Sequence, residues 1–333
     1  MAELIDALSA PAAGVPLWAW LLFLAVVVGL VMLDLGVFHR EEREIGIRES
    51  LWTSLFYVAA AVTFGGWVWL EMGSDAGLKF FTGYFIEKSL SLDNIFVISL
   101  IFGYFAIPRA YQHRVLFWGI IGVLAMRAVL IGFGTALVHR FDWMLPVFGA
   151  LLIVAAWRML FGAQDEASVT EGRILTQLQR RLPVTPDLHG RAFFVRLADP
   201  RDPARTRIWI TPLFLALVLV EFADAVFALE SVPAILAITQ EPYLVYTSNV
   251  FAVLGLRAMY FALAALIQRF TYLKHTLALI LAFVGAKIFY NKLVGHVHPG
   301  VSLAIILSLL AGGILLSWWK DRPVRTQPIG PTP

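Results

Sequence analysis

The 333-residue sequence contains no cysteine, and only 15% of its residues are charged. The absence of cysteine excludes disulfide bonds, zinc fingers, iron–sulfur clusters and a thiol nucleophile, because each of these needs that side chain. Soluble globular proteins have about 45–50% apolar and about 25% charged residues. Here 59% of the residues are hydrophobic, and the mean hydropathy is +0.77. The composition therefore excludes an ordinary soluble globule and predicts a polytopic membrane protein.

Nine segments are long and apolar enough to cross a bilayer, whose hydrocarbon core of about 30 Å needs roughly 20 residues of helix. They are residues 17–38, 51–71, 80–106, 115–138, 143–161, 209–238, 244–267, 273–291 and 299–319. We therefore expect an all-α bundle of about nine transmembrane helices. The residues before the first segment include Glu3 and Asp6 but no Lys or Arg. A cleaved signal peptide, which has a basic start, is therefore not expected.

The distribution of basic residues predicts the orientation of the chain. With the N-terminus outside, 19 Lys and Arg lie in cytoplasmic loops and 4 lie outside. Positive residues collect on the cytoplasmic side of membrane proteins, so we expect a cytoplasmic C-terminus. This bias also explains the formal net charge of +3 without a nucleic-acid partner. Trp318 and Trp319, which precede Lys320, are typical of an interfacial anchor.

The largest polar stretch is the loop at residues 162–208. Leucine and isoleucine side chains between 174 and 182 share one helical face, which predicts a short helix on the inner membrane surface. Residues 193–197 and 207–211 flank the turn-rich segment 199–203, which predicts a small hairpin. The loop has no Gly-rich phosphate-binding motif, so an ATP-driven pump is not expected.

Three short motifs recur in the same order at offsets of 131, 130 and 129 residues. The pairs are Asp93–Val97 with Asp224–Ala228, Val123–Ala128 with Val253–Ala258, and Arg140-Phe141 with Arg269-Phe270. Because each copy spans three helices, the second crosses the membrane in the opposite sense, which is a common plan of secondary transporters. The expected organisation is two N-terminal spans (1–79), a first repeat (80–161), a cytoplasmic loop (162–208), a second repeat (209–291), and a last span with a cytoplasmic tail (292–333).

Charged and polar residues interrupt four of the predicted spans. They are Glu87, Lys88, Ser89, Ser91, Asp93 and Asn94 in the third, Arg127 in the fourth, Glu221, Asp224, Glu230 and Ser231 in the sixth, and Arg257 in the seventh. A single charge at the centre of a membrane helix costs about 2.5–3.5 kcal/mol. These side chains must therefore face the interior of the bundle and meet one another, a cavity or a ligand.

Helical spacing brings several of these groups onto common faces. At about 100° per residue, Glu221 and Asp224 lie on one face of their helix. Glu87, Ser91 and Asn94 likewise lie on one face of theirs. Asp93 lies about 120° away from Glu87 on an ideal helix. Both can reach one site only if the helix is broken, for which Ser89–Ser91 offers a place, or if two walls of a cavity are used.

The ligand chemistry of this set is hard oxygen, which suits Mn²⁺, Mg²⁺ or Ca²⁺, whereas copper(I) prefers sulfur ligands. The histidines at segment ends and in loops are interpreted as surface residues, and these are His39, His113, His139, His275, His296 and His298. The alternative is a weak metal-binding site at His296 and His298 on the outer side of the membrane. Asp34, near the end of the first segment, is interpreted as a solvated helix end, with a place on the entry path of an ion as the alternative.

A purely structural role is a second interpretation of the buried charges. In an ion-pair network without transport, Glu87 and Asp93 would pair with Arg127, and Glu221 and Asp224 with Arg257. The acids outnumber the two arginines, however, and the surplus negative charge favours a bound cation or protons.

The motif at residues 82–97, TGYFIEKSLSLDNIFV, resembles the signature of the TerC family, in particular its Alx-type members. The similarity continues at Arg109, 112–116, 141–143, 193–195, 211–213, 220–224, 227–235 and 248–260, and covers about residues 17–320. The resemblance implies a bacterial inner-membrane protein that exports manganese, with Glu87, Asp93, Glu221 and Asp224 as the essential acids. Two positions depart from the family pattern: Ala223 stands where many relatives have Ser or Thr, and Glu230 where relatives often have Asp.

The sequence therefore predicts a secondary transporter in which Glu87, Asp93, Glu221 and Asp224 coordinate a divalent cation, with Mn²⁺ preferred and no prosthetic group. Asn94 and Ser91 are candidate neutral ligands, Arg127 and Arg257 candidate counter-ions, and Glu230 a supporting acid. Protons are a candidate for the exchanged ion. The alternative is a non-transporting membrane scaffold for secretion or metal-loading partners, as in a tellurium-resistance complex. An intramembrane enzyme is not expected, because no nucleophile–base pair is evident.

Overall fold

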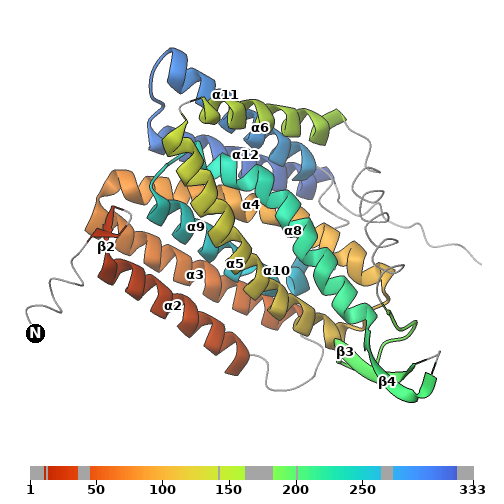
Figure 1. Cartoon of the computed structure of the whole chain (residues 1–333). Coiled ribbons are helices and arrows are strands. Elements are labelled where there is room, and N and C mark those ends of the chain that lie inside the picture. Colours follow the sequence, from red (N-terminus) through yellow and green to blue (C-terminus); the bar gives the residue numbers. More distant parts are fainter. Residues whose placement is uncertain are drawn as a thin grey trace, which may run out of the picture.

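The structure, a computed structural model, is an all-α polytopic membrane protein (Figure 1). It describes residues 11–12, 14–36, 46–141, 143–161, 183–199, 202–263 and 273–320. Within these residues, eight helical segments are long and apolar enough to span a membrane. They are α2 (Leu17–Gly36), α3 (Ile47–Met72), α5 (Arg109–Arg140), α6 (Met144–Phe161), α8 (Pro212–Leu236), α9 (Pro242–Leu254) together with α10 (Leu256–Leu263), α11 (Leu273–Leu293) and α12 (Pro299–Lys320).

The helix α4 (Ser74–Tyr104) is the predicted third span, but it is not among these eight. It has 31 residues and a length of about 46 Å at 1.5 Å per residue. Its sequence is too polar for a lipid-facing span, and it packs instead against α3, α8, α9 and α12. Unwinding near Ser89 does not occur, because α4 is helical throughout. The helices around α4 therefore bury Glu87 and largely cover Lys88.

The predicted span at residues 244–267 is interrupted. The helix α9 ends at Leu254, Gly255 is a turn, and α10 begins at Leu256. Helix α8, in contrast, continues through Pro233.

The hairpin predicted in the polar loop is confirmed. Strand β3 (Phe194–Asp199) pairs antiparallel with β4 (Asp202–Ile210), with Phe194 opposite Ile210. A second small pair, β1 (Pro11–Ala12) with β2 (Val15–Pro16), was not predicted. The surface helix expected at 174–182 and the anchor side chains at 318–320 lie outside the described residues.

Two triplets of spans meet in the middle of the bundle: α4, α5 and α6, and α8, α9 with α10 as one interrupted span, and α11. Helix α4 packs on α8 and α9, α5 packs on α8 and α9, and α6 packs on α11. If α4, α5 and α6 are exchanged with α8, α9 and α11, the same packed helix pairs are obtained. A two-fold symmetry relation between the triplets would require this. The sense of the repeat stays a prediction.

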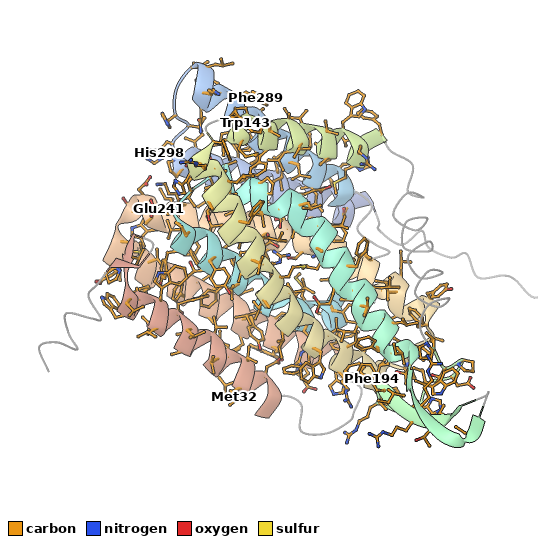
Figure 2. All side chains as sticks on the ribbon, in the orientation of Figure 1. Met32, Trp143, Phe194, Glu241, Phe289 and His298 are labelled. Carbon is orange, nitrogen blue, oxygen red and sulfur yellow. The ribbon has the colours of Figure 1, made fainter. Side chains whose placement is uncertain are left out.

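The two ends of the bundle can be named by their contents. Met32 of α2 and Phe194 of β3 lie toward one end, which we call the hairpin end (Figure 2). Glu241 and His298 lie toward the other, which we call the opposite end. Toward the opposite end, Phe23, Phe64, Tyr243 and Phe251 pack as an aromatic cluster that joins α2 and α3 to α9.

Candidate cation site

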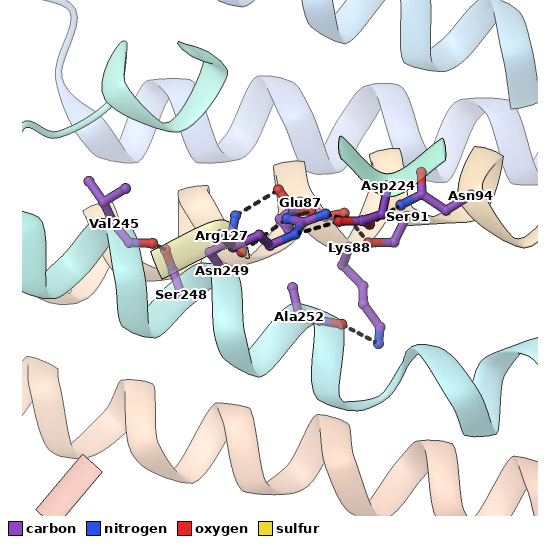
Figure 3. A network of polar contacts seen from close by, with 10 residues as sticks. All are labelled: Glu87, Lys88, Ser91, Asn94, Arg127, Asp224, Val245, Ser248, Asn249 and Ala252. Carbon is purple, nitrogen blue, oxygen red and sulfur yellow. Dashed lines mark hydrogen bonds and ion pairs between the residues drawn. The ribbon is translucent and has the colours of Figure 1, made fainter. Parts of the chain in front are cut away.

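Arg127 of α5 lies at the centre of the bundle with none of its surface exposed. It forms ion pairs with Glu87 of α4 and with Asp224 of α8 (Figure 3). Its Nη2 and Nε donate to the two oxygens of Asp224 at 3.0 and 3.2 Å, and its Nη1 donates to Glu87 Oε1. One guanidinium therefore holds two carboxylates, one from each helix triplet.

Two asparagine amides complete the contacts. Asn249 of α9 accepts a hydrogen bond from Arg127 at 2.9 Å and donates one to Glu87 Oε2 at 3.1 Å. Asn94 of α4 donates to Asp224 Oδ1 at 2.9 Å. Each carboxylate thus receives one arginine and one amide. We call Glu87, Asn94, Arg127, Asp224 and Asn249 the central cluster.

The central cluster carries more negative than positive charge. Glu87 and Asp224 are 1% and 5% exposed, and Arg127 compensates only one of their two charges. The neighbouring Lys88 points away from the cluster and donates to the carbonyl of Ala252 at 3.1 Å (Figure 3). Buried charges persist in proteins only when they are paired or bind ions, so the surplus makes this region a candidate cation site.

One amide oxygen of the central cluster is left over. Asn94 Oδ1 is buried and has no hydrogen-bond partner within the described part of the chain. Buried polar atoms are nearly always paired, and an orphan of this kind calls for an explanation. An amide oxygen beside a carboxylate is a ligand type that Ca²⁺ and Mn²⁺ accept.

Glu221 lies one helical turn before Asp224 on α8 and is half-buried. Its carboxylate lies directly against Gly122 of α5, where a Cβ atom would collide with it. This close approach of α5 to α8 needs glycine, because glycine alone has no Cβ. The sequence correctly places Glu221 and Asp224 together, and Gly122 was not predicted.

Other predicted members of the site have different surroundings. Ser91 donates to the backbone carbonyl of Glu87 at 2.8 Å. Glu230 is close enough to Arg158 of α6 for electrostatic interaction, so it does not belong to the central cluster. The side chain of Asp93 lies outside the described residues, although its backbone belongs to α4.

A compact group of three or more metal-binding acids or histidines does not occur within the described residues. Glu87 and Asp224 come together on Arg127, and Glu221 is next to Asp224 along α8. The four-carboxylate site therefore stays a prediction.

At the opposite end, His298 accepts a hydrogen bond from the Gly300 amide at 3.1 Å.

The predicted partner of Arg257 was wrong, and so was the interpretation of Asp34. Arg257 forms an ion pair with Asp34 of α2, not with Asp224, which belongs to Arg127. Asp34 is 5% exposed and is therefore not a solvated helix end. Spacing along the sequence could not reveal this, because α2 lies outside both repeats and reaches α10 only in the folded bundle.

Among the described residues, two cavities bear on the candidate site. A small one of about 30 Å³ is lined by Asn94, Asp224 and Arg257 together with apolar side chains, and it has room for about one or two water molecules. A larger one of about 870 Å³ lies at the opposite end, where Glu241 and His296 are among its lining residues.

Comparisons with known proteins give the family. Residues 72–325 match the model of the family described as "Integral membrane protein TerC family". An uncharacterized membrane protein of Myxococcus xanthus is 44% identical over 317 residues, which cover 95% of this chain and 96% of that protein. A protein of Salmonella typhi named "Putative membrane-bound redox modulator Alx" is 36% identical over 327 residues, covering 94% and 99%. No solved structure matches. The chain belongs to the TerC family of integral membrane proteins.

Proposed function

We propose that this protein is a secondary transporter that exports a divalent cation, preferably Mn²⁺, from the bacterial cytoplasm across the inner membrane. The observation that carries the proposal is the burial of Glu87 and Asp224, from different helix triplets, on a single arginine. Transporters built from inverted repeats bind their substrates where the repeats meet, near the middle of the membrane.

Arg127 acts in this proposal as the internal counter-ion of the two acids. A divalent cation that approaches Glu87 and Asp224 takes over their neutralisation, so Arg127 has to withdraw from at least one of them. Glu221 and Asp93 supply further carboxylate oxygens, and Asn94 supplies an amide oxygen. The donor set is entirely oxygen, which disfavours copper(I) and suits Mn²⁺, Ca²⁺ or Mg²⁺.

The orientation proposed here places the N-terminus outside and the C-terminus in the cytoplasm. The hairpin end is then cytoplasmic, and Arg196 and Arg207 of the paired strands belong to its positive charge. Cations would enter from the hairpin end and leave through the large cavity at the opposite end.

Exchange against protons is the proposed coupling. Inward-moving protons would neutralise the carboxylates that hold the metal and so release it. A proton gradient with the acidic side in the lumen of inside-out vesicles, the equivalent of the cell exterior, should therefore increase Mn²⁺ uptake. A flux that is indifferent to the gradient would contradict this coupling.

The test is Mn²⁺ uptake into inside-out vesicles or proteoliposomes that contain the full chain. Wild type is compared with Asp93→Asn and Asp224→Asn, with Ca²⁺ and Mg²⁺ as competitors. We expect flux in wild type and its loss in both variants. The matched control is Asp75→Asn, an exposed aspartate of α4, which should leave the flux unchanged.

A non-transporting scaffold is the second candidate function. The observation in its favour is the β3–β4 hairpin, on which Phe194 and Ile208 are 52% and 54% exposed. A scaffold should tolerate Asp224→Asn and lose function when the 162–208 loop is shortened, whereas a transporter should respond in the reverse way. The redox role in the names of some relatives could not use a thiol of this chain, which has none.

A further inference from the structure

A second buried ion pair lies apart from the central cluster. Asp34 of α2 and Arg257 of α10 are 5% and 3% exposed and bind each other through Oδ1 and Nη2. Met32 is close to Asp34 in the sequence and lies toward the hairpin end (Figure 2). The pair thus joins the end of α2, which lies outside the repeats, to α10, which belongs to the seventh predicted span.

The small cavity connects this pair with the central cluster. Its wall includes Arg257, which pairs with Asp34, and also Asn94 and Asp224 of the central cluster. Most of the remaining wall is apolar, including Ile98 and Val123. A cation that moves from Asp34 through this cavity to Asp224 would therefore pass Arg257.

The helix that carries Arg257 is separated from the helix that carries Asn249. The break lies at Gly255, where Lys88 donates to the Ala252 carbonyl near the end of α9. A Cβ at Gly255 would lie 2.8 Å from Lys88 Nζ and 3.1 Å from Tyr57 Cβ. The eight-residue helix α10 can therefore shift relative to α9 at a position that already lacks helical continuity.

We propose that the Asp34–Arg257 pair is the gate between the hairpin end and the central cluster. The gate is closed while Arg257 neutralises Asp34. An arriving divalent cation takes the place of Arg257 on Asp34, and α10 then moves at Gly255 and opens the way to the small cavity. Separating a buried pair without replacing one partner is strongly unfavourable, so the cation itself is required for opening. This inference rests on the transport function proposed above.

The experiment replaces both partners by apolar residues of similar size, Asp34→Leu with Arg257→Met. Removing both charges together leaves the net charge unchanged, and such replacements of buried pairs are often neutral or stabilising. The matched control is Arg48→Met with Glu71→Leu, two exposed residues of opposite charge on α3 that line neither cavity. Each purified full-length protein is checked for a single elution peak and thermal unfolding, and then assayed for Mn²⁺ binding and for Mn²⁺ flux in proteoliposomes.

If the pair is a gate, the variant Asp34→Leu with Arg257→Met should bind Mn²⁺ as wild type does. Its flux should be lower by about tenfold or more, because the two apolar side chains offer a cation no ligand. Flux within about twofold of wild type, too small a change for a lost charged ligand, would overturn the gate. So would loss of binding together with flux, which would place the pair inside the binding site.

A second measurement does not depend on transport or on the apolar variant. The chain lacks cysteine, so Val123→Cys puts a single thiol in the wall of the small cavity. Ag⁺, a thiol-reactive cation small enough for a cavity of this size, is added to each face of sealed vesicles separately. With Asp34→Asn, labelling from the hairpin face should be about tenfold faster, because the lost pair no longer holds the gate closed. Unchanged labelling from that face would overturn the gate even if wild type carries no Mn²⁺.

Discussion

The same arrangement of charges occurs twice along α4, once buried and once exposed. In the central cluster, Arg127 lies between Glu87 and Asp224. At the opposite end, Lys79 lies between Asp75 at 2.6 Å and Glu241 at 3.5 Å, whose side chains are 64% and 51% exposed. Each group has one cation between two carboxylates, and α4 contributes to both.

The difference between the two groups lies in what surrounds them. Water screens the exposed group, and such ion pairs contribute only about 0–1 kcal/mol to stability. The central cluster is shielded from bulk water, and removing one member of a buried pair costs about 3–5 kcal/mol because a charge is left alone. A buried pair is often no more stable than apolar residues in its place, so stability alone does not explain why these charges lie there. Function is the better explanation.

The largest expected effect comes from removing each cation in turn. Arg127→Met leaves Glu87 and Asp224 without their shared partner and should lower the free energy of unfolding by about 3–5 kcal/mol. Lys79→Met should lower it by at most about 1 kcal/mol. Denaturant unfolding of both variants in the same detergent measures the contrast. Equal losses would show that burial does not set the two groups apart.

An intermediate effect is expected at the amide that supports Glu87. Asn249→Leu removes a donor to a buried carboxylate and an acceptor for Arg127, and should cost about 1–3 kcal/mol. The control is Asn291→Leu, whose side chain accepts one hydrogen bond from the Val297 amide at 3.0 Å near the surface. If the two variants unfold at the same denaturant concentration, the amide contributes nothing specific to the central cluster.

The smallest expected effect concerns two glycines of the same helix. Gly122→Ala drives a Cβ into the Glu221 carboxylate, whereas Gly132 has no atom within 4 Å of its Cβ position. Overpacking costs about 1–3 kcal/mol, and the low end applies because the half-buried Glu221 can move. Gly132→Ala should instead stabilise by about 0.5–1 kcal/mol. Mn²⁺ flux should fall only in Gly122→Ala. A loss of flux in both variants would show that the effect does not act through Glu221.

The sequence predicted most of the charged side chains that are buried against their preference, but only one of their pairings. Glu87 with Arg127 was correct, since both are charges in apolar segments that must find partners. The second partner, Asp224, depends on the packing of α5 on α8, which no local pattern encodes. The hairpin was predictable because turn chemistry is local.

Three features escaped prediction for identifiable reasons. Asp34 is only a few residues from the end of an apolar segment, where water is the usual partner. Asn249 is a single amide in an apolar stretch and gives no periodic signal. Gly255 lies in a pattern that a helix tolerates, and its closeness to Lys88 and Tyr57 arises only in the folded bundle.

The most direct test of the central claim is equilibrium Mn²⁺ binding to the purified full-length protein, followed by the electron paramagnetic resonance signal of the free ion. We expect the signal of free Mn²⁺ to fall saturably with wild type, at about one ion per chain, which is the stoichiometry of a single site between two repeats. Asp224→Asn should abolish the loss, and Asp75→Asn should leave it unchanged. Binding that persists in a folded Asp224→Asn protein would contradict the account, because the central cluster would then not hold the cation.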